Sequence, residues 1–160
     1  MAKPFPLQPL LQLARQKNES AIRNLGLLNQ QHQTALGKLA TLQQFLKDYQ
    51  NKFQEAAKNG MSPSDLRNFQ DFIYRLDQAI KQQQGVIELT THSVNAGRIE
   101  LNEAQRKMQS FDTLEQRHIH AENIKEAKIE QKMQDEYSGR FAIYKAAEKN
   151  NDELEGVKHE

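Results

Sequence analysis

The sequence predicts an all-α fold in which two long helices form an antiparallel coiled-coil hairpin, the second helix being longer and overhanging the first. Apolar residues recur from Leu7 to Ala56, and again from Leu66 to Phe111, at alternating steps of four and three residues. This alternation is the 3.5-residue period of a coiled coil. Between the two runs stands Asn59-Gly60, a dipeptide typical of a turn.

The first run predicts a helix over residues 5–58. In each heptad, two seam positions face the partner helix. One seam position holds Leu11, Asn18, Leu25, His32, Leu39, Leu46 and Phe53, and the other holds Leu7, Ala14, Ala21, Leu28, Ala35, Leu42, Tyr49 and Ala56. We interpret the polar His32 as a residue that fixes which layers of the two helices pair, a known use of polar seam residues.

Residues 59–62 have the composition of a turn between two helices. Gly60 can adopt the left-handed conformation that ends a helix. Ser62 is a good N-cap and Pro63 suits the first helical position. Asp65, three residues after Ser62, completes a pattern like a capping box.

The second run predicts a helix over residues 63–144. Its seam positions hold Leu66, Ile73, Ile80, Ile87, Val94, Leu101 and Met108 together with Phe69, Leu76, Gln83, Thr90, Gly97, Ala104 and Phe111. An antiparallel register that places Phe53 opposite Phe69 also places Leu25 opposite Gly97. In this register small residues repeatedly face large ones, which fills the seam without voids. The same register predicts that His32 faces Thr90 and that Leu39 faces Gln83.

Past Phe111 the second helix outruns its partner, and its heptad pattern stops. This overhang is densely charged and has no single apolar face. Such a helix either docks onto another molecule or stays solvated, and both alternatives are open. We expect one domain over residues 1–144 and a disordered tail over residues 145–160.

Composition excludes several classes of protein. At 160 residues, a 37% apolar content and a mean hydropathy of -0.87 suit an extended coiled coil better than a globule with a deep core. The absence of cysteine is compatible with a reducing cytoplasm. We expect a cytoplasmic protein, because the sequence shows neither a signal peptide nor an apolar stretch that could insert in a membrane. Basic residues are widely spaced, so nucleic-acid binding is not expected.

Motifs for catalysis or metal binding are scarce. Gly37-Lys38 is followed by Leu39 and does not form a phosphate-binding loop. His118 and Glu122 are one helical turn apart and His120 is close by, but a zinc site needs three or four converging ligands. We therefore expect no enzyme activity, no cofactor and no metal.

A group of apolar residues lies outside the seam, where a two-helix coil should be polar. Phe45, Phe72, Ala79 and Val86 share one flanking heptad position. Three of them, Phe45, Phe72 and Ala79, should form an apolar patch with the edges of Leu42, Tyr49 and Leu76, on one side of the hairpin near the turn. Exposed apolar surface of this kind indicates a partner, although the residues could also only broaden the seam.

Four segments resemble the flagellar export protein family FliJ, and the likeness covers about residues 5–142. The segments are NFQDFIYRLDQAI at 68–80, LATLQQFLKDY at 39–49, LEQR at 114–117 and QKMQDE at 131–136. The resemblance implies an antiparallel coiled coil, similar to the central stalk of rotary ATPases, that takes part in flagellum biogenesis and motility.

The resemblance also implies three partners. They are the hexameric flagellar export ATPase, the cytoplasmic domain of a membrane export-gate protein, and the escort chaperones of late flagellar substrates. This implies a cytoplasmic protein held peripherally at the membrane of the flagellar base. The gate-contacting positions of the family correspond here to Leu42, Phe45, Tyr49, Phe72, Leu76 and Ala79. Lys38 and Gln83 depart from the residues usual in the family, glutamine and histidine.

We expect the open end of the hairpin, which comprises the N-terminus and the charged overhang around residues 117–140, to enter the ATPase ring. The residues expected to bind the ATPase are Arg117, Glu122, Lys125, Lys128, Glu130, Lys132, Asp135 and Glu136. The chain itself is expected to be a monomer. The alternatives are a related stalk protein of an injectisome and a generic coiled-coil scaffold or tether that uses the same heptads between chains.

Overall fold

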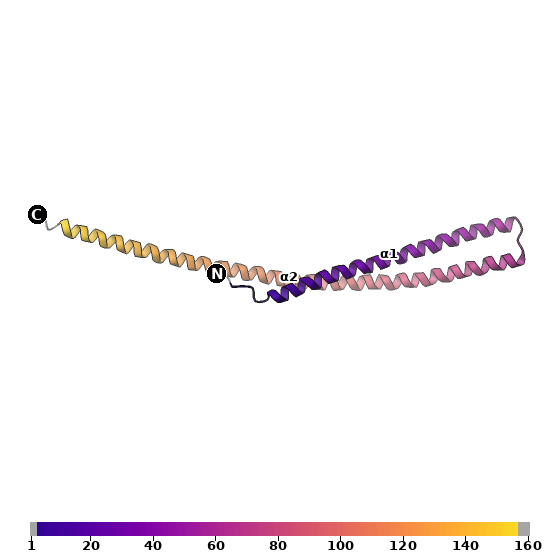
Figure 1. Ribbon diagram of the computed structural model, residues 1–160, viewed down its shortest axis with the longest axis horizontal. Helices are drawn as coiled ribbons and strands as arrows, with labels where there is room; N and C mark the ends of the chain where they lie inside the picture. The colour runs from indigo at the N-terminus through magenta and orange to yellow at the C-terminus, as the bar shows by residue number, and fades with distance from the viewer. Residues whose placement is uncertain (1–2, 157–160) are drawn as a thin grey trace. The chain divides into compact units, whose positions relative to one another are not determined.

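The computed structural model describes residues 3–156 and contains two helices within that range. Helix α1 spans Gln8–Lys58, 51 residues, and helix α2 spans Pro63–Gly156, 94 residues. The chain divides into two compact units, residues 12–109 and residues 3–11 with the chain from residue 110 onward. In the first unit α1 and α2 lie side by side and antiparallel (Figure 1). The predicted all-α fold with a longer second helix is confirmed.

Helix α1 begins at Gln8 rather than at residue 5, because prolines shape the segment that leads into it. Phe5 precedes Pro6 and is therefore biased toward an extended backbone. The chain then turns, and the Gln8 N–H donates to the Phe5 carbonyl oxygen at 3.2 Å. Pro9 is tolerated because the first turn of a helix needs no N–H donor.

The turn has the predicted chemistry. Gly60 has a φ of 90°, a left-handed conformation that suits glycine. The Asp65 N–H donates to Ser62 Oγ at 3.1 Å, and the Ser62 hydroxyl donates to Asp65 Oδ2 at 2.6 Å. Ser62 therefore caps α2, and Pro63 is its first residue.

The core of the hairpin lies at the predicted seam. Every buried apolar residue of the described chain occupies a seam position: Leu11, Ala14, Ala21, Ala35, Leu76, Ile80 and Val94. Two contacts confirm the predicted register. The rings of Phe53 and Phe69 lie 5.7 Å apart, and His32 Nδ1 is 2.9 Å from Thr90 Oγ1.

The two helices lie close together at Gly97, the one glycine of residues 3–149 at which an added Cβ atom would have a neighbour within 4 Å. A Cβ atom at Gly97 would lie 2.8 Å from Leu28 Cδ1 and 3.4 Å from Leu25 Cδ1. The predicted pairing of Leu25 with Gly97 is thus confirmed. Gly85, by contrast, has nothing within 4 Å of such an atom. Gly97 leaves room for two leucines, and Gly85 has no packing role.

Two polar seam residues, Gln83 and Asn18, differ in whether their side chains find a hydrogen-bond partner. Gln83 was expected opposite Leu39, but its Nε2 donates to the Ala35 carbonyl oxygen at 2.9 Å, one helical turn earlier. The length of the glutamine side chain allows this reach. Asn18 is 8% exposed, and its Oδ1 has no hydrogen-bond partner. Such an unsatisfied buried acceptor reduces stability.

The charged part of α2 belongs to the second unit. From Ala127 to Lys149 every residue is exposed. Helix α2 was expected to end at Tyr144, but it continues without a break to Gly156. The disorder expected for residues 145–160 in solution stays a prediction, and residues 157–160 lie outside the described chain.

Candidate partner-binding surfaces

An aromatic cluster joins the two helices near the turn. Tyr49 of α1 lies 5.1 Å from the ring of Phe69 and 4.2 Å from the ring of Phe72, both on α2. Both pairs are tilted, at 50° and 43°, a geometry that aromatic rings favour over a face-to-face sandwich. Tyr49 therefore anchors Phe72 across the hairpin.

The six residues predicted to bind the export gate differ in exposure. Phe45 is 55% exposed and Phe72 is 42% exposed, so both rings are available to a partner. Leu42, Tyr49 and Ala79 are half-buried. Leu76 is buried in the seam and can only support the others from below. We call the set Leu42, Phe45, Tyr49, Phe72, Leu76 and Ala79 the aromatic patch.

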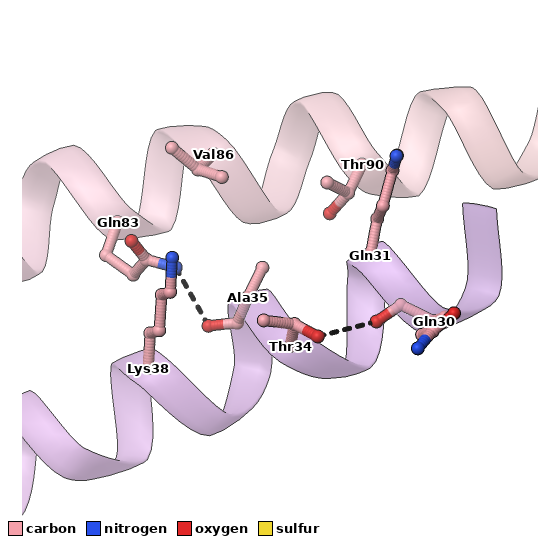
Figure 2. A pocket seen from close by; sticks show the side chains of 8 residues that line it. All are labelled: Gln30, Gln31, Thr34, Ala35, Lys38, Gln83, Val86 and Thr90. Carbon is pink, nitrogen blue, oxygen red and sulfur yellow. Dashed lines mark hydrogen bonds between the residues drawn. The ribbon is translucent and has the colours of Figure 1, made fainter. Parts of the chain in front are cut away.

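Two adjoining hollows lie around Lys38, and no motif or spacing in the sequence predicted them. The first, of about 490 Å³, is lined by eight residues: Gln30, Gln31, Thr34, Ala35, Lys38, Gln83, Val86 and Thr90 (Figure 2). The second shares Thr34, Lys38 and Gln83 with it and reaches Leu42 of the aromatic patch. Five of the eight residues that line the first hollow carry an amide or a hydroxyl group, and Lys38 is the one charged residue that lines either hollow. The hollows offer hydrogen bonds but no group of residues suited to catalysis.

The charged segment of α2, residues 117–140, holds the residues predicted to bind the ATPase. Seven of the eight are exposed: Arg117, Lys125, Lys128, Glu130, Lys132, Asp135 and Glu136. Glu122 is the exception, with only 7% of its surface exposed. Glu122 Oε1 accepts from Lys125 Nζ at 2.6 Å.

The chain's own N-terminal residues bury Glu122. The Lys3 backbone N–H donates to Glu122 Oε2 at 3.3 Å. His118 Nε2 lies 2.9 Å from the Lys3 carbonyl oxygen, and because a carbonyl only accepts, Nε2 is the donor. The Phe5 ring packs 5.7 Å from the His118 ring. We call residues 3–5 the N-terminal strap.

The strap changes the electrostatics of Glu122. The hydrogen bond from Lys125, followed by that from the Lys3 N–H, lowers the pKa of the Glu122 carboxyl below its usual 4.5. Both donors favour the ionised form. The carboxylate therefore serves an internal contact, which the sequence analysis missed.

The described part of the chain shows neither a metal-binding cluster nor a membrane-spanning helix. Among residues 3–149, no group of three or more His, Cys, Asp or Glu side chains is placed to hold a metal ion. His118 and Glu122, the pair that the sequence places one helical turn apart, are both engaged by the strap. Neither described helix combines the length and the hydropathy that crossing a membrane requires.

Comparison with known proteins agrees with the resemblance found in the sequence. The family model described as "Flagellar FliJ protein" matches residues 2–147. The flagellar FliJ protein of Escherichia coli (strain K12) is 29% identical over 145 residues, covering 91% of this chain and 99% of the relative. That of Salmonella typhi is 28% identical with the same coverage. Because the family model spans nearly the whole chain, this protein belongs to the flagellar FliJ protein family.

Proposed function

We propose that this chain is a non-enzymatic component of the flagellar type III protein export apparatus. In this role it acts as a stalk-like coiled coil that binds the export ATPase ring, promotes its assembly and activity, and links it to the export gate. The observation that carries the proposal is the presence of two different exposed surfaces, one aromatic and one charged. Family membership supports the flagellar system over an injectisome.

The aromatic patch is the proposed site for the export gate. Exposed aromatic side chains held by a rigid scaffold bury large apolar areas on binding and often dominate interface energies. Phe72 is held in this way by Tyr49, at a ring distance of 4.2 Å. The partner is the cytoplasmic domain of the membrane export-gate protein. Binding it would hold this chain peripherally at the membrane of the flagellar base.

The charged segment is the proposed site for the ATPase. Basic and acidic side chains alternate along it, as in Lys128, Glu130 and Lys132, and all three are exposed. Exposed charges contribute more to the orientation and rate of association than to affinity. The ATPase ring would provide charges of opposite sign. Escort chaperones of late substrates are the third proposed class of partner.

The gate assignment is tested by removing one exposed aromatic ring. In the Phe72→Ala variant we expect affinity for the purified gate domain to fall about tenfold, or about 1.4 kcal/mol, as for the minority of interface residues whose truncation costs more than about 1 kcal/mol. Tyr74→Ala is the matched control, because Tyr74 lies on the same helix, is 64% exposed and is outside the aromatic patch. Calorimetric titration measures both variants. Equal affinity of Phe72→Ala and the wild type would contradict the assignment.

The ATPase assignment is tested by reversing one charge. Lys132→Glu should reduce binding to the hexameric ATPase and the stimulation of ATP turnover, and the loss should shrink at high salt. Lys47→Glu is the control, because Lys47 is also exposed but lies on α1 in the other unit. Identical behaviour of the two variants would argue against the charged segment.

A further inference from the structure

Glu122 is the one buried residue in a segment of exposed charges. Its 7% exposure contrasts with the chain from Ala127 to Lys149, in which every residue is exposed. A buried carboxylate needs compensating donors. Glu122 has two, the Lys125 ammonium and the Lys3 backbone N–H. The strap therefore satisfies a group that would otherwise be free to meet a partner.

The strap is bound through its backbone. His118 and Glu122, one helical turn apart on α2, contact the carbonyl oxygen and the N–H of the same residue, Lys3. Phe5 adds a ring contact with His118. Pro4 stands between the two contact residues and restricts Lys3 to an extended backbone. The site on α2 thus recognises an extended chain followed by an aromatic residue.

The contact between strap and helix is incomplete. A hollow of about 290 Å³ remains between them, lined by strap residues and by Glu115, Ile119 and Asn123. The strap is not part of either helix. Segments with few contacts and no regular backbone hydrogen bonding open most easily. The strap can therefore leave α2 without unfolding the helix.

We propose that the N-terminal strap is a removable cover over the start of the charged segment, and that the ATPase binds this segment only after the strap has left Glu122 and His118. This inference rests on the proposed function, because it concerns regulation of the ATPase-binding site. When the strap is closed, its backbone occupies the carboxylate and the imidazole. When it is open, both groups become available to the ATPase.

The first experiment weakens the contact between the strap and α2 by changing a strap residue, so that the charged segment keeps its own sequence. In Phe5→Ala, loss of the contact with His118 should increase the open fraction. Apparent affinity scales with the fraction of the binding-competent state, so ATPase binding should tighten, by about threefold if roughly one third of wild-type molecules are open. Leu27→Ala is the control, since Leu27 is an exposed apolar residue of the other unit. Weaker binding by Phe5→Ala would show that the strap is part of the binding surface, and would overturn the proposal.

The second experiment fixes the cover in place. The natural chain has no cysteine, so Lys3→Cys and Asn123→Cys introduce the sole thiols, and both positions line the same hollow. A thiol-cleavable cross-linker between them should reduce ATPase affinity by about tenfold or more, because the open fraction falls, and cleavage should restore it. The uncrosslinked double variant is the matched control, and circular dichroism checks that helicity is unchanged.

The outcomes distinguish a failure of the proposed cover from a failure of the proposed function. Equal ATPase binding by the cross-linked and cleaved forms would overturn the cover while leaving the ATPase assignment intact. Failure of every form, the wild type included, to bind the ATPase would overturn the proposed function and the cover with it.

Discussion

Replacing Gly97 by alanine tests the packing of the hairpin most sharply. Alanine in a helix interior is favoured over glycine by about 1 kcal/mol. At Gly97 the new methyl group would lie 2.8 Å from Leu28 Cδ1 and 3.4 Å from Leu25 Cδ1. Overpacking of a well-filled seam costs about 1–3 kcal/mol. The net change in the free energy of unfolding at Gly97 is therefore between about zero and a loss of 2 kcal/mol.

Gly85→Ala supplies the matched control. Gly85 also lies within α2, but its new methyl group would have no neighbour within 4 Å. Only the helix-propensity term acts there, so we expect a gain of about 1 kcal/mol. In a chain of this size, 1 kcal/mol shifts the melting temperature by about 2–4 °C. Urea and thermal unfolding, followed by circular dichroism, measure both variants.

A double-mutant cycle identifies the neighbour responsible. Leu28→Ala removes the side chain that the new methyl group meets first. Gly97→Ala should therefore cost less in the Leu28→Ala background than in the wild type, a coupling of about 0.5–3 kcal/mol. Equal stabilisation by Gly97→Ala and Gly85→Ala, with no coupling to Leu28, would refute the close approach of the helices at Gly97.

Three further predictions concern polar and turn residues. Asn18→Leu should stabilise the hairpin by about 1–2 kcal/mol in urea unfolding, because it removes a buried acceptor without a partner; the exposed Asn24→Leu should change stability by less than about 0.5 kcal/mol. Gly60→Ala should destabilise by about 1–2 kcal/mol, because its φ of 90° disfavours a side chain, whereas Gly37→Ala, within α1, should not. The strap should open in acid. The pKa of Glu122 is lowered in the folded chain, so the contribution of its carboxylate is complete above its ordinary value of 4.5 and is lost as the pH falls through the lower, folded value. The groups around it that carry or can carry charge are Lys125, His118, Lys3 and Glu115. The Lys3 amide signal in NMR should report this opening, and Glu122→Gln should remove its pH dependence.

Much of the fold follows from local sequence patterns. The alternating steps of the apolar residues determine which faces of the helices meet, and Gly60, Ser62 and Pro63 fix where the chain reverses. Phe53 opposite Phe69 and His32 opposite Thr90 follow from the resulting register. The start of α1 was less predictable, because the turn from Phe5 to Gln8 depends on closely spaced prolines rather than on periodicity.

The aromatic patch could be predicted because it breaks the heptad rule. Phe45 and Phe72 occupy positions that are normally polar, and both are exposed. Heptad position could not predict, however, how exposed each member of the patch is. Leu76 is a seam residue and is buried. The hollows around Lys38 depend on the actual reach of Gln83 to Ala35, which a register alone does not specify.

The strap could not be predicted from periodicity. Lys3 meets His118 and Glu122 across separations of 115 and 119 residues. Each contact uses the backbone of Lys3, which carries no residue-specific signal. The sequence indicates only that Pro4 and Pro6 keep this segment out of a helix.

A bridging experiment tests the central claim, that one chain links the ATPase to the export gate. Immobilised hexameric ATPase is mixed with the gate domain, with and without this chain, and the retained proteins are quantified. We expect the gate domain to be retained only when the chain is present, and Phe72→Ala to lose the gate domain while the chain itself stays on the ATPase. Retention of the gate domain without the chain, or displacement of the chain from the ATPase by the gate domain, would contradict the account.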